Sequence, residues 1–171
     1  TVQGNTISAK GTNITYGIYT SSTTAWTISG NNIHGGTGSN PIGIALLSSS
    51  STVVKNNIIS GGNGGGPYGL FCSSCGAAKV VNNTINAGTL TSAGTAYAIL
   101  INGSNTMSIT NNIVYSTSSI GSRYGVVEFS AFSDPSMLQN NLFFDVPNGY
   151  YLDEGTTARI MENDLNNFSN T

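Results

Sequence analysis

The chain has 171 residues, the length of one domain, and only 7% of them are charged, against about 25% in an average soluble domain. The formal net charge of −2 excludes a nucleic-acid surface built from lysine and arginine. A hydrophobic share of 38% with so little charge is unlike a disordered chain, and no apolar run reaches the roughly 18 residues of a membrane span.

A short motif recurs along the chain from its first residues onward: an Asn, then Asn, Thr or Asp, then Ile or Leu. It first reads Asn5-Thr6-Ile7 and returns every 23 to 29 residues. The leading asparagines are Asn5, Asn31, Asn56, Asn83, Asn111, Asn140 and Asn163. A second motif, such as Tyr16-Gly17-Ile18, follows in phase, and clusters of Gly, Ser, Asn and Pro separate the apolar segments. This period predicts a coil with three short strands per turn, paired in parallel between turns.

The alternation of side chains predicts that the repeated Asn points into the coil. The inward set would contain the residue two before the Asn, such as Val54 or Val81, the Asn itself, and the Ile or Leu two after it. Apolar residues also stand three before the Asn, so either a bend breaks the alternation there or an apolar ridge is exposed. Amides stacked in successive turns would satisfy one another's donors and acceptors, which predicts an internal Asn ladder.

The turn length, the Asn-Asn-Ile corner and the Gly-Ile strand resemble the right-handed parallel β-helix repeats of the pectin-lyase-like superfamily. The resemblance implies an all-β fold: a single-stranded right-handed parallel β-helix of about six to seven turns, forming one domain over residues 1–171. The low charge and the abundance of Ser, Thr, Asn and Gly also resemble β-helix lipoproteins and adhesins of bacterial surfaces. No amphipathic cap follows Leu165, which predicts either a longer parent chain or end-to-end association.

Aromatic residues accompany the small residue of the second motif. They are Tyr16, Tyr68, Tyr97 and Tyr124 before it, and Tyr19, Phe71 and Tyr151 two positions after it. Alternation places one of these sets on the outer face of a sheet, and the alternative is an aromatic stack that fills the coil. In the superfamily that the chain resembles, this outer face often forms the saccharide cleft. The resemblance therefore implies that Tyr19, Phe71, Tyr97, Tyr124 and Tyr151 are candidates to stack on sugar rings.

The two cysteines, Cys72 and Cys75, are separated by Ser73-Ser74. Redox chemistry would need a βαβ context, and one pair cannot complete a zinc site, so we expect either a local disulfide or buried thiols. His34, the single histidine, opens a Gly-rich loop with no acid near it in the sequence, and we interpret it as a surface residue. No metal and no cofactor are expected.

No acidic residue precedes Glu128. The acids are Glu128, Asp134, Asp145, Asp153, Glu154, Glu162 and Asp164. Enzymes of the superfamily that the chain resembles use clustered Asp residues, or carboxylates that hold Ca²⁺ together with an Arg or Lys base. An enzyme built on this chain would draw on Glu128, Asp153 and Glu154, with Arg123 nearby. Solvated acids at one end of the coil are the simpler interpretation.

These observations favour a non-catalytic protein, extracellular or on the bacterial outer surface, whose loops and aromatic residues contact glycans or host surface molecules. Two alternatives stay open: a lyase or glycoside hydrolase that acts on acidic polysaccharide, and a structural stalk. Nucleic acid is not an expected partner, and no transmembrane segment is recognised. Self-association, either end to end or lateral, is a further expectation.

Overall fold

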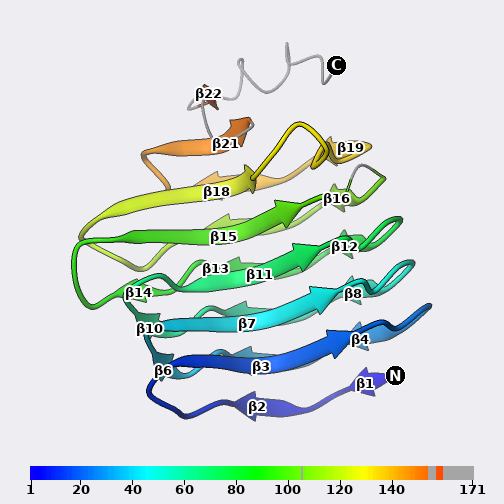
Figure 1. Ribbon diagram of the computed structural model, residues 1–171, viewed down its shortest axis with the longest axis horizontal. Helices are drawn as coiled ribbons and strands as arrows, with labels where there is room; N and C mark the ends of the chain where they lie inside the picture. Colours follow the sequence, from blue (N-terminus) through cyan, green and yellow to red (C-terminus); the bar gives the residue numbers. More distant parts are fainter. Residues whose placement is uncertain (105, 154–156, 160–171) are drawn as a thin grey trace.

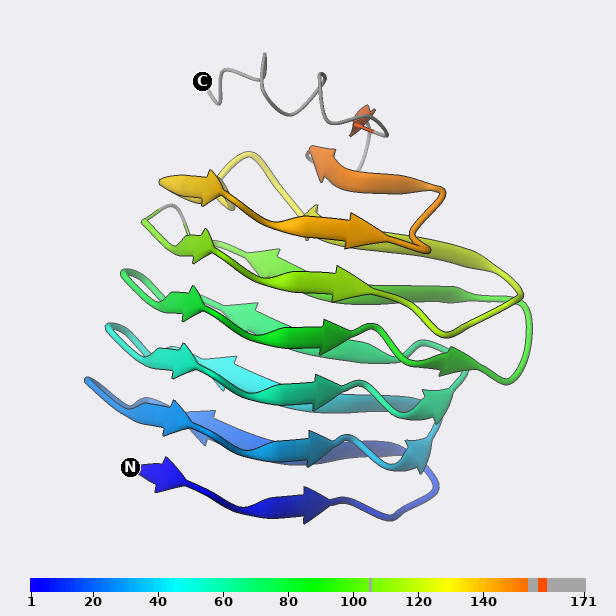
Figure 2. The ribbon, with the colours of Figure 1, turned by 180° about the vertical axis from the view of Figure 1, so that it is seen from behind.

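The computed structural model describes residues 1–104, 106–153 and 157–159. The regular elements in this part of the chain are β-strands, wound into about six turns of a parallel coil. The strands at the front of Figure 1 run from left to right while the chain climbs from the N-terminus, so the coil is right-handed. Figure 2 shows the return strands from behind. The predicted fold class is therefore confirmed. Among the described residues, no helix is long and apolar enough to span a bilayer.

Three long sheets run along the coil, and each takes one strand from every turn. Sheet A contains β1 (Val2–Gln3), β4 (Thr27–Ser29), β8 (Val53–Lys55), β12 (Lys79–Val81), β16 (Ser108–Thr110) and β19 (Met137–Gln139). Sheet B contains β2 (Thr6–Ser8), β5 (Asn32–His34), β9 (Ile58–Ser60), β13 (Thr84–Asn86), β17 (Ile113–Tyr115) and β20 (Leu142–Phe144). Sheet C contains β3 (Ile14–Ser21), β7 (Asn40–Leu47), β11 (Tyr68–Ser73), β15 (Thr95–Asn102), β18 (Ser122–Glu128), β21 (Gly149–Asp153) and the antiparallel β22 (Thr157–Arg159). Between sheets B and C lies the small sheet D, with β6 (Thr37–Gly38), β10 (Asn63–Gly64) and β14 (Thr89–Leu90).

The corner between sheets A and B is made by one residue of positive φ in each turn. These corner residues are Gly4, Gly30, Asn56, Asn82, Asn111 and Asn140, with φ between 56° and 68°. Glycine adopts this left-handed conformation without steric penalty, and Asn is among the few other residues that tolerate it. The backbone of the corner therefore explains why the sequence repeats Gly-Asn or Asn-Asn at this point.

The residue after each corner points inward and forms the Asn ladder. Its members are Asn5, Asn31, Asn57, Asn83, Asn112 and Asn141. Each of the first five donates from Nδ2 to the Oδ1 of the next member at 3.0–3.2 Å. Its backbone N–H donates to the same Oδ1 at 2.9–3.0 Å. Interior members also donate to backbone carbonyls, as Asn57 does to Ile28 and Lys55.

The structure shifts the expected ladder by one residue in three turns. Asn5, Asn31 and Asn83 lie in the ladder, whereas Asn56, Asn111 and Asn140 are the exposed corner residues. In those turns the following Asn takes the interior position. Both positions carry the same side chain, so the motif alone did not distinguish them, and the backbone conformation does. The expected seventh member, Asn163, lies outside the described residues.

The same corner breaks the alternation of side chains along each turn. The inward residue of sheet A therefore lies three positions before the ladder Asn, and the expected inward residue Val81 is on the outer side. The fully buried residues at this position are Ile28, Val54, Val80 and Ile109. On sheet B the inward residues include Ile33, Ile59, Ile85 and Val114. Ile58, Ile113 and Leu142, which were expected inside, are exposed on the outer face of sheet B.

Candidate functional site

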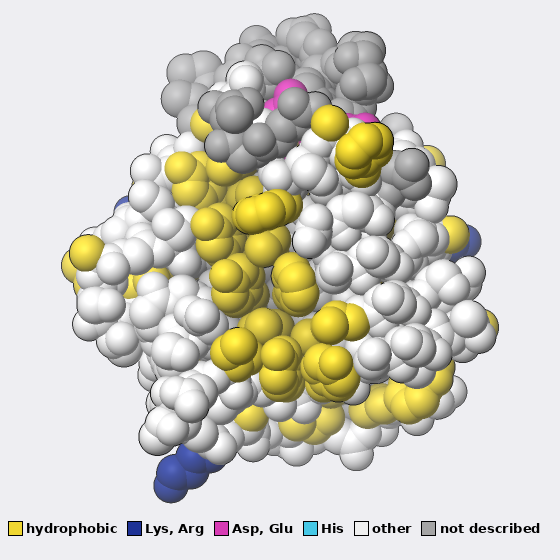
Figure 3. Space-filling model, viewed as in Figure 1, with side chains coloured by type: hydrophobic (Ala, Val, Ile, Leu, Met, Phe, Trp, Pro, Cys, Tyr) yellow, Lys and Arg dark blue, Asp and Glu magenta, His cyan; other side chains and the backbone are white. Residues whose placement is uncertain are grey.

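An aromatic stripe runs along the outer face of sheet C, where hydrophobic side chains form a continuous band in Figure 3. Two columns of side chains form the stripe, and each takes one residue from β3, β7, β11, β15 and β18 in turn. The first column is Tyr16, Ile42, Tyr68, Tyr97 and Tyr124. The second column is Tyr19, Ala45, Phe71, Leu100 and Val127.

Both columns face outward because a small residue stands between them and points inward. Residues three apart on a regular strand would lie on opposite faces of the sheet. At Gly43, however, a Cβ atom would lie 2.6 Å from the Gly69 carbonyl oxygen and 2.6 Å from Ile59 Cγ2. Only a residue with little or no side chain fits there. Gly43 and Ile44 therefore both lie on the inner side of β7, and Ala45 is the next residue to point outward.

One expected ligand residue lies inside the coil instead. Tyr151 is fully buried and pairs with Val126 in the inward column. Gly149 pairs with Tyr124 and not with the small residue Gly125, so the last turn is one residue out of phase with the motif. The structure therefore corrects the expectation for Tyr151. The remaining expected residues, Tyr19, Phe71, Tyr97 and Tyr124, lie in the stripe together with Tyr16 and Tyr68.

The rings of the first column stack on one another along the coil axis. The ring centroids of Tyr68 and Tyr97 are 5.3 Å apart and those of Tyr97 and Tyr124 are 6.1 Å apart, with interplanar angles of 16° in both pairs. Tyr16 instead meets Tyr19 edge to face at 5.0 Å. Burial within the stack, with a smaller contribution from the charge of Tyr97, raises the pKa of Tyr68 above its ordinary value of 10.0. Its hydroxyl is thus a hydrogen-bond donor at neutral pH.

The stripe is hollowed at β7. There the first column contributes Ile42, which is 6% exposed, and the second contributes Ala45, which is fully buried. A hollow of about 170 Å³ opens above Ile42, and it is lined by Ile14, Tyr16, Asn40, Ile42, Tyr68 and Phe71. None of these side chains carries a charge. No sequence motif points to Ile14, Asn40 and Ile42, because strand pairing alone makes them neighbours of Tyr68 and Phe71.

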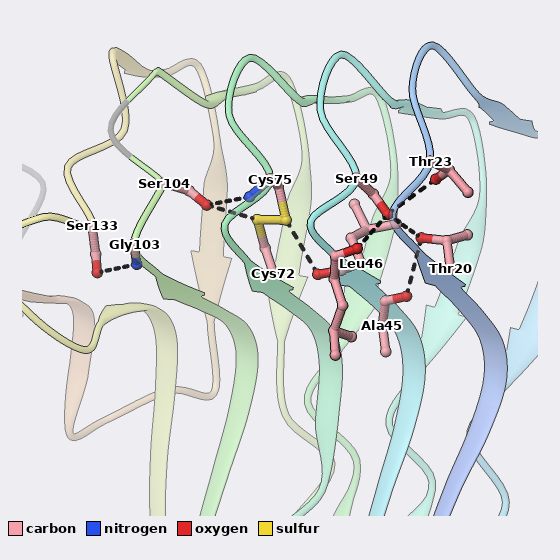
Figure 4. The surroundings of a disulfide bond; sticks show 11 residues. Thr20, Thr23, Ala45, Leu46, Ser49, Cys72, Cys75, Gly103, Ser104 and Ser133 are labelled. Atoms are coloured by element: carbon pink, nitrogen blue, oxygen red, sulfur yellow. Dashed lines mark hydrogen bonds between the residues drawn. A yellow bond between two sulfur atoms is a disulfide. The ribbon is translucent and has the colours of Figure 1, made fainter.

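Cys72 and Cys75 form a disulfide inside the corner that follows sheet C. Both residues are fully buried. Figure 4 shows that Cys75 stands between Ser49 and Ser104 in a column of side chains that line this corner. Its backbone N–H donates to Ser104 Oγ at 2.7 Å. Of the two expectations, a local disulfide and buried thiols, the structure has the disulfide, and its sulfur atoms fill part of the core.

Of the candidate catalytic residues that the structure describes, Glu128 and Asp153 follow the paired residues Val127 and Leu152 on neighbouring strands, and Arg123 lies apart from them. Glu128 is fully buried, at the register position of Ile101, with its side chain inside the coil. Asp153 ends the neighbouring strand β21 and is half-buried, and Glu154 lies outside the described residues. Arg123 lies five residues from Glu128 on β18, about 16 Å along an extended strand, and donates from Nη1 to the Ser118 carbonyl at 2.7 Å.

His34 has a structural hydrogen bond, and no cluster of metal-ligating side chains surrounds it in the described part of the chain. His34 is half-buried at the end of β5, and its Nδ1 accepts a hydrogen bond from the Gly36 N–H at 2.9 Å. This bond stabilises the turn after β5 and occupies one ring nitrogen. Within the described residues, no three His, Cys, Asp or Glu side chains gather as metal ligands would.

Comparison with known proteins identifies the class to which the chain belongs. Residues 1–131 match the family described as "Right handed beta helix region". The match spans well over half of the chain, so the protein belongs to this family of right-handed β-helix proteins, in agreement with the pectin-lyase-like superfamily. No curated protein and no solved structure matches the chain. Many unrelated activities occur on one fold, so the function must come from the surface of the coil.

Proposed function

We propose that this β-helix binds glycans through the aromatic stripe of sheet C, without chemical turnover, outside the cell or on the bacterial outer surface. The observation that carries the proposal is the stripe itself, an uncharged row of rings on one continuous sheet face. Aromatic rings pack against the C–H groups of sugars, and tyrosine hydroxyls at their edges form hydrogen bonds. A contiguous apolar patch on a soluble protein is a typical interaction surface.

Two features support the location and the absence of turnover. A buried disulfide between Cys72 and Cys75 favours an oxidising compartment such as the extracellular space. Among the described candidates, Glu128 is inside the coil and Arg123 stands at the other end of β18, so these two side chains do not reach one substrate together. General acid-base catalysis requires such groups within hydrogen-bond reach of the same substrate atoms. Binding is therefore favoured over a lyase or hydrolase activity.

A glycan array with matched variants tests the proposal. Phe71→Ala removes one ring of the stripe, and Phe132→Ala removes a ring that is 75% exposed on the loop between β18 and β19. We expect the wild type and Phe132→Ala to bind the same glycans, and Phe71→Ala to bind them about tenfold more weakly. Equal binding by all three proteins would show that the stripe does not bind the glycan. No binding to any glycan would favour a structural stalk, and release of reducing or unsaturated ends would establish an enzyme.

A further inference from the structure

The aromatic stripe lacks one ring in its first column. Tyrosines stand at the same register position on β3, β11, β15 and β18, but β7 contributes Ile42. In the second column β7 contributes Ala45, the smallest side chain at that position. Both side chains are buried, so the hollow of about 170 Å³ opens between Tyr16 on one side and Tyr68 on the other. We refer to this hollow as the β7 notch.

The spacing of the strands suits the insertion of one ring. Tyr16 and Tyr68 belong to strands that are two apart, which separates their positions by about 9.6 Å along the coil. A flat ring at the level of β7 would thus lie about 4.8 Å from each, within the range of about 4.5–7 Å at which rings stack. The turns beyond already show this arrangement, with Tyr68 and Tyr97 stacked at 5.3 Å. The missing tyrosine leaves Tyr68 without a ring neighbour on the β7 side of its column.

The side chains around the β7 notch define the chemistry of the ring. The polar groups among them are the Asn40 amide and the hydroxyls of Tyr16 and Tyr68, and none is charged. A charged group placed there would lose hydration without gaining an opposite charge. A pyranose whose hydroxyls are all equatorial has C–H groups on both faces and hydroxyls around its edge only. Its two faces match two flanking rings, and its edge matches an amide and hydroxyls.

We propose that the β7 notch binds one neutral pyranose ring with equatorial hydroxyls, held between Tyr16 and Tyr68 with its edge toward Asn40. The inference rests on the proposed glycan-binding function, and it adds the position and the sugar class. Tyr68, Tyr97 and Tyr124 stack on one another, and in this column Tyr68 has no ring beside it on the β7 side, where the notch leaves room for a sugar.

Ile42→Tyr tests the notch by supplying the missing ring. The same register position holds Tyr on four other strands, so the variant should fold, with a melting temperature at or above that of the wild type. We expect it to bind cellotetraose, a neutral oligosaccharide of β-linked glucose, about 10-fold to 100-fold more weakly than the wild type, because two ring contacts are lost. Ile58→Tyr adds the same ring at a position that is 56% exposed on β9 of sheet B, away from the stripe, and should bind as the wild type does. NMR titration that follows the ring signals of Tyr16 and Tyr68 gives the affinities.

A second sugar distinguishes recognition of the ring shape from non-specific binding to an apolar surface. An oligosaccharide of β-1,3-linked galactose has an axial hydroxyl on one face of every ring, and we expect the wild type to bind it about tenfold more weakly than cellotetraose. Unchanged binding of cellotetraose by Ile42→Tyr would show that the β7 notch is not the sugar site, while the proposal of glycan binding elsewhere on the stripe would stand. Tighter binding of p-cresol than of cellotetraose would assign the notch to an aromatic guest and overturn the sugar. A wild type that binds no neutral glycan would contradict both the notch and the proposed function.

Discussion

At Asn56 and Asn57 two identical side chains have different roles because the backbone turns between them. Asn56 has a φ of 56° and is exposed, so its structural role is to adopt the left-handed backbone conformation of the corner. Asn57 is 1% exposed and exchanges hydrogen bonds with Asn31 and Asn83. A buried amide in this position is stabilising only while its neighbours in the ladder are present, since each alone would leave polar atoms unpaired.

This difference predicts the outcome of two single substitutions. Asn56→Gly should change the free energy of unfolding by only a few tenths of a kcal/mol, because glycine also adopts the corner conformation. Asn57→Leu should lower it by about 1–3 kcal/mol for each buried polar group left unpaired, among them the Asn31 amide and the Ile28 carbonyl. Equilibrium unfolding in urea measures both. Equal losses for the two variants, or a larger loss for Asn56→Gly, would contradict the assignment of the ladder.

Tyr68 links the stripe to the pH dependence of stability. Its raised pKa means that the folded protein holds the phenolic proton more tightly than the unfolded chain, whose value is 10.0. The corresponding stability is complete below pH 10.0 and is lost as the pH rises through the folded pKa. Tyr68→Phe should therefore lose stability less steeply above this pH than the wild type. Melting temperatures measured across the alkaline range test this, and identical slopes would show that the Tyr68 hydroxyl is not responsible.

At the scale of the element, each corner of the coil has its own way of satisfying buried groups. The corner between sheets A and B uses stacked amides, and the corner after sheet C uses hydroxyl groups and one disulfide. Thr23 Oγ1 donates to Ser49 Oγ at 3.0 Å, and the Ser104 Oγ accepts from the Cys75 N–H in the same column. The disulfide therefore replaces a hydroxyl contact in one turn of an otherwise polar column.

Replacing the disulfide by the residues of the preceding turn tests this equivalence. Cys72→Ala with Cys75→Ala should lower the free energy of unfolding by about 2 kcal/mol from the lost cross-link alone, and by more from the cavity. Cys72→Leu with Cys75→Ser copies Leu46 and Ser49 and should lose less, because it refills the core and restores a hydroxyl. Alkylation of the denatured native protein should label Cys72 and Cys75 only after reduction. Labelling without reduction, or equal losses for the two double variants, would argue against this picture.

At the scale of the whole molecule, the apolar interior is one column that continues from turn to turn. Buried side chains from Ile18 to Tyr151 form a single cluster, and every turn contributes to it. Each turn of such a coil contacts its neighbours only, so stability is close to a sum over turns and the interfaces between them. The inner faces of the sheets are packed against one another in the core, so a ligand can bind only on their outer faces or on the loops.

The low charge of the molecule predicts how a glycan complex responds to salt. No charged side chain lines the β7 notch, and the ten positions of the stripe are uncharged. The affinity for a neutral glycan should therefore change by less than about twofold between low salt and about 1 M NaCl, where the screening length falls to about 3 Å. Isothermal titration at the two salt concentrations measures the change. A strong loss of affinity in salt would place the glycan on charged residues elsewhere.

The sequence by itself determined the fold class, because a polar residue repeated at a constant interval is stable in a core only when copies of it stack. It also identified the residues around each corner, the aromatic motif and the cysteine pair. It did not fix which of two adjacent asparagines is buried at the corners of Asn56, Asn111 and Asn140, because identical side chains carry no signal about the backbone φ. The phase of the last turn, and with it the burial of Tyr151, came only from strand pairing, because the last turn keeps the motif while its register moves by one residue.

The candidate site depended on tertiary structure to a greater degree. The aromatic motif predicted rings on one face of a sheet, but two outward columns exist only because Gly43 and its equivalents press against the opposite wall of the coil. The β7 notch brings Ile14 and Asn40 to Tyr68 and Phe71, residues that are far apart in the chain and that meet because strands one turn apart pair in register. Local periodicity records which side chains are repeated, whereas the close packing of successive turns decides which face they occupy and where a gap is left.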